Sequence, residues 1–328
     1  MIEFYKSEID KMKIPSAKGL FIFAEADKTL YIQITNNLEK SIRQLFQAMK
    51  ADKNVFQLIS QTDKISYELY NSLFEALIHK KMLENTDHPE FNEQIKSYES
   101  YVYLGIDLQK PPYFKVVENT QQNDFYLGPF KHRFFVFDLL DAMAGLFKFP
   151  LCPDKKPYPC KRYKNNLCDG WCIKNKLTTY QKVILSYIFR EIELLVHAKA
   201  EQKKYYDDLY FNKAEKLKNL IRIVEKYDAY LKFLFITKNL NLEFQDENHQ
   251  YKVSKGRIES VFYKKKEYDF SYVSIDYREN ELLAFNKDEL SERRIIYNHL
   301  IKKNDKIILD KIDKIFKKSQ LKVRSVLT

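Results

Sequence analysis

The chain has 328 residues, enough for about two domains and for hydrophobic cores that need no disulfide support. Its 56 lysines and arginines exceed its 45 aspartates and glutamates, and the resulting net charge of +11 is typical of proteins that bind polyanions. Six scattered glycines exclude a Walker loop and a dinucleotide fingerprint, and no apolar run reaches ~18 residues. We therefore expect a soluble cytoplasmic protein with no membrane partner that is neither a nucleotide-driven motor nor a Rossmann enzyme.

The first hundred residues predict a module with the order β-β-α-α. Residues 17–34 contain two runs of aromatic and branched residues around a polar turn, a pattern typical of a β-hairpin. A helix is expected after Asn36 or Asn37, because apolar residues recur along one face at Leu38, Ile42, Leu45 and Phe46. A second helix is expected over about 64–82, with an inward face of Ile65, Leu69, Leu73, Leu77 and Ile78.

The remaining two thirds of the chain predict strands, a loop and several helices. Residues 101–150 begin like strands and end in the helix-like run FFVFDLLDAMAGLF, and the segment that follows is rich in proline. A capping-box pattern at Thr178 and Gln181 predicts a helix to about 205, and a second helix over about 211–235 completes a hairpin. The last ninety residues combine short strands with a lysine-rich terminal helix.

All four cysteines lie between residues 152 and 172, in a segment without helical or strand periodicity: Cys152, Cys160, Cys168 and Cys172. In a reducing compartment such a cluster indicates a metal site, and four thiolates satisfy either Zn²⁺ or an iron-sulfur cluster. The spacing alone does not decide between them. Basic residues of this segment alternate with tyrosines and a tryptophan, which predicts a surface for phosphates and bases at Lys155, Lys156, Lys161, Arg162 and Lys164.

Five stretches occur in the order found in one known family. They are Gly19-Leu20-Phe21, Tyr31-Ile32-Gln33 with Asn37-Leu38, the YLGPF run of Tyr126–Phe130, the Pro159-Cys160 run with Cys168 and Cys172, and Phe211–Lys218. In these patterns the chain resembles the UvrC/Cho-like GIY-YIG nucleases of bacterial nucleotide-excision repair, with a degenerate GIY-YIG motif. The resemblance covers about residues 14–235, and it favours a [4Fe-4S] cluster, with Zn²⁺ as the alternative, on the four cysteines.

The residue patterns and the resemblance together predict an α+β fold in four parts. These are a GIY-YIG nuclease-like β-sheet/helix domain (14–100), linker strands with the cysteine-rich metal segment (101–175), a UVR-like α-helical hairpin (176–235) and a small C-terminal α/β appendage (236–328). The hairpin would dock a UvrB-type partner.

The resemblance also implies a set of catalytic residues. Tyr31 matches the second tyrosine of the motif, Glu75 is the match for the glutamate that holds Mg²⁺ or Mn²⁺, and Asn92 matches a later asparagine. The helix arginine of the family falls on Ser41, so Lys40, which lies about 100° away on the helix, is the nearest stand-in. Phe21 replaces the first tyrosine and Gln33 replaces a glycine, so we expect weakened incision, since a missing arginine typically costs of order 10³–10⁵ in phosphoryl transfer.

Two further functional interpretations stay open beside a repair endonuclease that binds damaged or distorted DNA. A catalytically inactive relative would keep the scaffold as a DNA-binding or partner-docking module. A cluster-based redox or iron sensor would use the cysteines instead.

Overall fold

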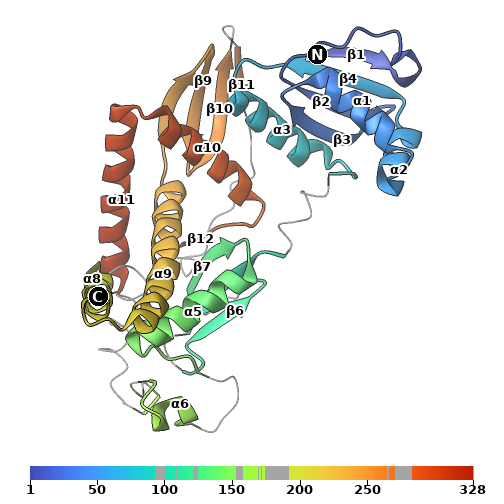
Figure 1. The fold of residues 1–328 in the computed structure, drawn as a ribbon. Coiled ribbons are helices and arrows are strands. Elements are labelled where there is room, and N and C mark those ends of the chain that lie inside the picture. Colours follow the sequence, from blue (N-terminus) through green and yellow to red (C-terminus); the bar gives the residue numbers. More distant parts are fainter. Residues whose placement is uncertain are drawn as a thin grey trace.

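A computed structural model describes residues 1–92, 100–107, 110–120, 125–152, 158–168, 170, 172–173, 192–263, 266–269 and 283–327. Three four-stranded sheets occur in this part of the chain, and Figure 1 shows the first of them set to one side of the other two. Within the same ranges, no helix has the length and apolar character required to cross a lipid bilayer. The α+β class expected from the sequence is confirmed.

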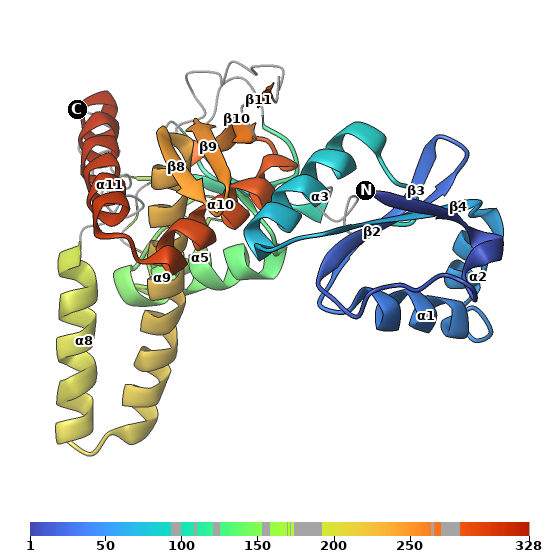
Figure 2. The same cartoon turned by 90° about the horizontal axis from the view of Figure 1, so that it is seen from above.

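Residues 1–92 form an antiparallel sheet of order β1-β4-β2-β3 that is covered by helices on both faces (Figure 2). Its elements are β1 (Ile2–Tyr5), β2 (Gly19–Glu25), β3 (Lys28–Thr35), α1 (Leu38–Ala48), α2 (Lys53–Gln61), β4 (Lys64–Leu69) and α3 (Leu73–Asp87), with a 3₁₀ turn at Lys6–Glu8. Because side chains alternate along a strand, Phe21 and Phe23 pack toward α1 and α2, whereas Leu20 and Ile22 pack toward α3.

The hairpin and the first helix of this module are confirmed, but the helix expected over 64–82 is wrong in its first part. Residues 64–69 form the strand β4, which pairs with both β1 and β2. Ile65 and Tyr67 are buried, so the segment follows the period of two that a strand requires. The helix begins only after Ser72, whose hydroxyl accepts a hydrogen bond from the Glu75 amide at 3.4 Å.

The second sheet joins segments from the middle and from the end of the chain. Its order is β12-β7-β5-β6, with β5 (Val102–Ile106), β6 (Phe114–Val117), β7 (Phe125–Phe130) and β12 (Leu283–Ala284). The strand β12 runs parallel to β7, with Leu283 opposite Leu127. The helix α5 (Arg133–Phe147), expected from the sequence, follows β7 and buries its apolar face in the large core.

The third sheet is an antiparallel meander of order β11-β10-β9-β8, made of β8 (Leu242–Asp246), β9 (His249–Ser254), β10 (Arg257–Tyr263) and β11 (Lys266–Asp269). The helices α10 (Glu289–Lys303) and α11 (Lys306–Leu327) follow it. A single hydrophobic core connects this region with α3, α5 and α9 (Phe211–Lys238). The residues expected as a small appendage therefore share their core with the middle of the chain.

A buried ion pair within α10 ties this helix to the end of α9. Arg293 is fully buried, bonds Glu289 Oε2 at 2.6 Å and donates to the Thr237 carbonyl at 2.7 Å. The turn beside it contains Gly256 at φ +78°, and a Cβ atom there would lie 2.0 Å from the Thr237 carbonyl oxygen. Only glycine fits this turn while these contacts are kept.

The helices α8 (Ile192–Asp207) and α9 lie side by side as an antiparallel pair (Figure 2). Lys199 and Glu225 form an ion pair across them at 2.6 Å, and the Tyr206 hydroxyl bonds the Glu215 carboxylate. The second helix of the expected hairpin is thus present. The start of the first, including Thr178 and Gln181, lies outside the described residues.

Candidate active site

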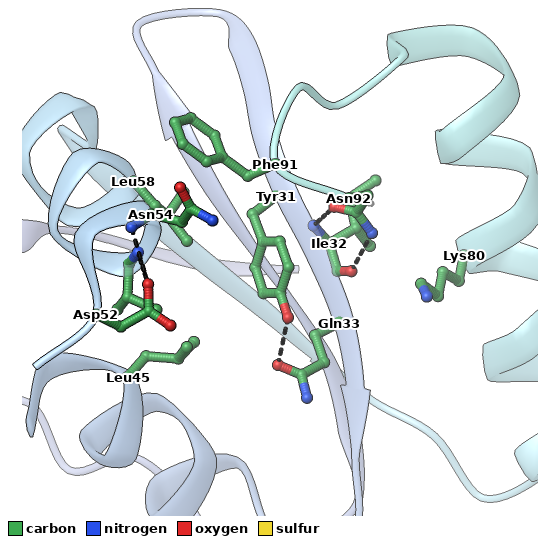
Figure 3. Close-up of a pocket in the computed structure, with 11 residues that line it drawn as sticks. Tyr31, Ile32, Gln33, Leu45, Asp52, Asn54, Leu58, Lys80, Phe91 and Asn92 are labelled. Atoms are coloured by element: carbon green, nitrogen blue, oxygen red, sulfur yellow. Dashed lines mark hydrogen bonds between the residues drawn. The ribbon is translucent and has the colours of Figure 1, made fainter. Parts of the chain in front are cut away.

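A cavity of about 330 Å³ opens beside Tyr31 on β3 (Figure 3). Helix α2 and the loop before Asn92 contribute most of its other walls. We call it the Tyr31 pocket and define it by its lining residues: Tyr31, Ile32, Gln33, Leu45, Asp52, Asn54, Val55, Leu58, Lys80, Phe91 and Asn92. It contains two residues of the expected catalytic set, Tyr31 and Asn92.

The hydroxyl of Tyr31 is already engaged by a neighbouring side chain. It donates a hydrogen bond to Gln33 Oε1 at 2.9 Å (Figure 3), and the tyrosine ring stacks on Phe23 with 6.3 Å between ring centroids. Burial raises the pKa of Tyr31, because the phenolate would lose its solvation. Both effects oppose the deprotonated tyrosine that would help to activate a water molecule.

Phe21, which stands where the family has its first tyrosine, lies in the core. Phe21 is fully buried, and its ring meets that of Phe23 edge-on at a centroid distance of 5.6 Å. On the neighbouring β3, Gln33 occupies the glycine position and places an amide on the Tyr31 hydroxyl. Phe21 thus removes the hydroxyl of the first tyrosine, and Gln33 occupies the hydroxyl of Tyr31 with a hydrogen bond.

The first turn of α1 holds Ser41 where the family pattern places arginine. The Ser41 hydroxyl lies 2.6 Å from Thr35 Oγ1, so it is part of the hydrogen bonding that starts the helix. Asn37 caps the helix by accepting from the Lys40 amide at 2.9 Å. The side chain of Lys40 is exposed and does not line the Tyr31 pocket, and Arg43 pairs with Glu39 at 3.4 Å.

The amide of Asn92 holds the loop after α3 against β3. Its Oδ1 accepts from the Ile32 amide at 2.8 Å, and its Nδ2 donates to the Ile32 carbonyl at 2.7 Å. Nδ2 also approaches Glu84 Oε1 at 3.3 Å. Every side-chain polar atom of this buried residue thus has a protein partner, as expected of a residue that positions the wall of the pocket.

Three polar lining residues were not identified from the sequence. Asp52 caps α2 through the Asn54 and Val55 amides at 2.8 and 3.2 Å, and Lys80 pairs with Glu84 on α3 at 3.2 Å. An aspartate followed by an amphipathic run is a helix-start signal that could have revealed α2 and hence this wall. Lys80 lines the pocket because of the angle at which α3 crosses the sheet. The spacing of residues along the sequence does not encode that angle.

Glu75 lines a different cavity of about 410 Å³, between α3 and the turn that joins β8 to β9. We call it the Glu75 pocket and define it by Glu68, Leu69, Tyr70, Asn71, Glu75, Ile78, His79, Met82, Glu247, Asn248, His249, Tyr251 and Val261. The structure therefore does not bring Tyr31 and Glu75 into one site.

Carboxylates crowd the Glu75 pocket. Glu75 Oε1 lies 3.4 Å from His249 Nε2, and Glu68 Oε2 accepts from the Tyr70 hydroxyl at 2.9 Å. The pKa of Glu75 is raised, first by burial and then by the nearby charges of Glu68, Asp246 and Glu247. Burial also lowers the pKa of His249, which disfavours the imidazolium that would offset these charges.

The four cysteine thiols lie near one another, around Tyr113. The pKa of Cys152 is raised to about 12 by burial and by the charges of Cys168, Cys172 and Cys160, in that order. Among the described residues, however, no group of three or more cysteine, histidine, aspartate or glutamate side chains is arranged to hold a metal ion. The thiols as placed among the described residues therefore do not form the ligand set of a cluster or of zinc.

The expected basic surface is only partly described. Lys155 and Lys156 lie outside the described residues. The short helix α6 (Lys161–Lys164) follows Cys160 and exposes Lys161 and Lys164, while Arg162 Nη2 donates to the Leu167 carbonyl at 3.2 Å. Tyr163 of the same helix is also exposed.

The curated proteins similar in sequence to this chain include several that are named UvrABC system protein C. The chain is 27% identical over 167 residues to UvrABC system protein C of Fervidobacterium nodosum, which covers 50% of this chain and 29% of the relative. The corresponding protein of Finegoldia magna is 25% identical and covers 65% and 37%, and that of Mycoplasma mycoides is 24% identical and covers 87% and 46%. No family model matches the chain. The chain thus spans less than half the length of these curated relatives.

Solved structures give a shorter match. The GIY-YIG N-terminal endonuclease domain of UvrC from Thermotoga maritima bound to magnesium is 22% identical, covering 26% of this chain and 98% of that one with a TM-score of 0.25. A point mutant of the same domain bound to its divalent cation is 24% identical, covers 26% and 97%, and also has a TM-score of 0.25. The sequence relatives confirm the resemblance to the UvrC family.

Proposed function

We propose that this chain is a DNA-repair protein of the UvrC type that binds damaged or distorted DNA and has weakened endonuclease chemistry. Homology to proteins of the UvrABC system supports nucleotide-excision repair as the process and phosphodiester incision as the reaction. The net charge of +11 supports a polyanionic substrate. DNA binding and the loss of incision strength are the parts of the proposal that need direct measurement.

One observation carries the weakened chemistry, namely the hydrogen bond from the Tyr31 hydroxyl to Gln33 Oε1. General-base assistance requires a hydroxyl that can give up its proton, but this one is partly buried and held by a neutral amide. Transition-state charge on the phosphoryl oxygens requires a cation, but Lys40 does not line the pocket and Lys80, which does, is paired with Glu84. The proposal therefore gives Tyr31 and Lys40 at most a minor catalytic contribution.

The separation of Tyr31 from Glu75 favours a second candidate, a catalytically inactive relative. In that case the scaffold would bind DNA or dock a partner, with Asn92 keeping the sheet and loop in place. A redox or iron sensor built on the cysteines is a weaker third candidate, because the described thiols do not form a ligand set.

The metal proposals rest on the resemblance to the UvrC family. A [4Fe-4S] cluster, or alternatively Zn²⁺, is proposed for the four cysteines, and Mg²⁺ or Mn²⁺ for Glu75 if incision occurs. Iron, sulfide and zinc analysis of protein purified without oxygen tests the first of these. A protein free of iron and zinc that keeps its native circular dichroism spectrum would contradict it.

The location and the protein partner are also proposals. Homology to a component of the UvrABC system supports a UvrB-type partner, and we propose the hairpin of α8 and α9 as its docking element. A cytoplasmic location follows from a role on chromosomal DNA. A pull-down in which the chain with an intact hairpin retains no UvrB-type protein would argue against this pairing.

An incision assay on end-labelled DNA with a bulky lesion or a bubble tests the proposed function. The wild-type chain is compared with Glu75→Ala and with Glu243→Ala, which changes an exposed glutamate on β8 outside both pockets. We expect slow nicking that requires Mg²⁺ or Mn²⁺ and that only Glu75→Ala abolishes. Retained DNA binding without nicks would establish the inactive relative, and neither binding nor nicks would refute both candidates.

A further inference from the structure

The helix α11 uses one face for packing and turns the other to solvent. Ile308, Ile312 and Phe316 are buried and belong to the large core, and the Phe316 ring meets that of Phe235 on α9 at a centroid distance of 5.9 Å. Figure 1 shows α11 standing beside α9 along the outside of the molecule. These three side chains anchor the first half of α11 to the core.

The outer face of α11 carries exposed lysines on successive turns. Successive turns place Lys306, Asp310, Lys314 and Lys317 along one line, and all four are exposed. Among the described residues, none of these three lysines forms an ion pair. By contrast, the lysines at 64, 218 and 252 pair with glutamates at 2.9, 3.0 and 2.9 Å.

We propose that this outer face of α11 binds the phosphate backbone of duplex DNA, an inference that rests on the proposed function. The line from Lys306 to Lys317 is ~16 Å long at 1.5 Å per residue, which matches about five base-pair steps. Uncompensated lysines on a rigid helix gain affinity by releasing counter-ions, and they read no sequence. This helix would thus add a second DNA-binding surface, well separated in sequence from the cysteine segment.

Salt dependence of DNA binding measures this contact directly. The triple variant Lys306→Gln/Lys314→Gln/Lys317→Gln is compared with Lys64→Gln/Lys218→Gln/Lys252→Gln, which removes the same charge from lysines that already have partners. We expect the slope of log K against log salt to fall by about 3 for the α11 variant and to change little for the control. Equal slopes for the two triple variants would overturn the inference.

A variant that adds a DNA contact provides a second test, because tighter DNA binding cannot result from a loss of protein stability. Asp310→Lys places a fourth cation in the line and should steepen the salt slope by about 1, with tighter binding at low salt. Unchanged affinity would contradict the inference. If the wild-type chain binds DNA but neither α11 variant differs from its control, only this inference fails; if the wild-type chain binds no DNA, the proposed function fails with it.

Discussion

The Tyr31 pocket and the Glu75 pocket satisfy their polar groups in opposite ways. In the first, the Tyr31 hydroxyl bonds a neutral amide, Asp52 caps α2, and Lys80 pairs with Glu84 at 3.2 Å. In the second, burial and then the nearby charges of other acids raise the pKa of Glu75. The residues that the family resemblance assigns to one reaction are thus divided between a pocket whose charged groups have partners and a pocket crowded with acids.

This division separates structural roles from the catalytic roles that the resemblance implies. Tyr31 and Asn92 shape the sheet, since one stacks in the aromatic core and the other ties a loop to β3. Both structural roles depend only on contacts within the protein. The following experiments would break or sharpen the comparison.

The largest effect is expected from Ser41→Arg. This change returns a guanidinium to the first turn of α1, and we expect the incision rate to rise by as much as ~10³. Gln47→Arg is the matched control because Gln47 is exposed and lies about 120° away from Ser41 around the same helix. Equal rates for the two variants, measured with Mg²⁺ or Mn²⁺ on bubble DNA, would mean that the Tyr31 pocket lacks more than a cation.

Removal of the Asn92 amide should lower stability substantially. Asn92→Ala leaves the Ile32 amide and carbonyl without partners in a buried place, and we expect the free energy of unfolding to fall by ~2–4 kcal/mol. Urea denaturation measures this loss. Asn54→Ala, at an exposed position of the same pocket, should change stability by under ~0.5 kcal/mol. A stable Asn92→Ala protein without incision would instead assign this residue a catalytic role.

A smaller change is expected from Tyr31→Phe. The variant loses one neutral hydrogen bond to Gln33, which corresponds to ~1 kcal/mol of stability. Tyr163→Phe serves as the control because Tyr163 is exposed on α6. If incision is detectable and Tyr31 takes no part in proton transfer, the rate should stay within a few-fold of wild type. A much larger loss of rate at unchanged stability would contradict our interpretation of the Tyr31 pocket.

The smallest effect is a change in the pH dependence of stability at Glu75. Its pKa is raised in the folded state, so folding takes up protons and the free energy of unfolding falls as pH rises from about 4.5 through the raised value. Glu75→Gln should flatten this fall, whereas Glu243→Gln should not. Thermal unfolding across this pH window measures the difference. If the stability of wild type and of Glu75→Gln changed with pH in parallel, the pKa of Glu75 would not be raised in the folded state.

The sequence predicted elements well where the side-chain period was unambiguous. The hairpin of β2 and β3, the helix α1 and the helix α9 were all expected within a few residues. β4 was mistaken for helix because Ile65 and Leu69 also stand four residues apart, which fits a helical face as well as a strand. Pairing with β1 and β2 decided the outcome, and such long-range pairing leaves no local signal.

The candidate site was predictable only in part. The family resemblance selected Tyr31 and Asn92, which do share a pocket, but it also led to Lys40, whose backbone amide donates to the Asn37 cap while its side chain is exposed. Lys80 lies in the Tyr31 pocket because α3 crosses the sheet, and Glu75 lies elsewhere for the same reason. Which helix side chains reach which pocket depends on the angle between elements, which spacing along the chain does not encode.

The parallel pairing of β12 with β7 constrains the order in which the protein can be built. Leu283 pairs with Leu127, so one edge of β7 has no neighbour until the ribosome has made residues beyond 284. At ~5–20 residues per second this edge waits on the order of ten seconds. During that time its unpaired amides and carbonyls invite contact with other nascent chains. Expression yield should therefore depend on translation speed and chaperone supply more strongly for residues 100–327 than for the N-terminal module, whose strands all lie within its first 69 residues.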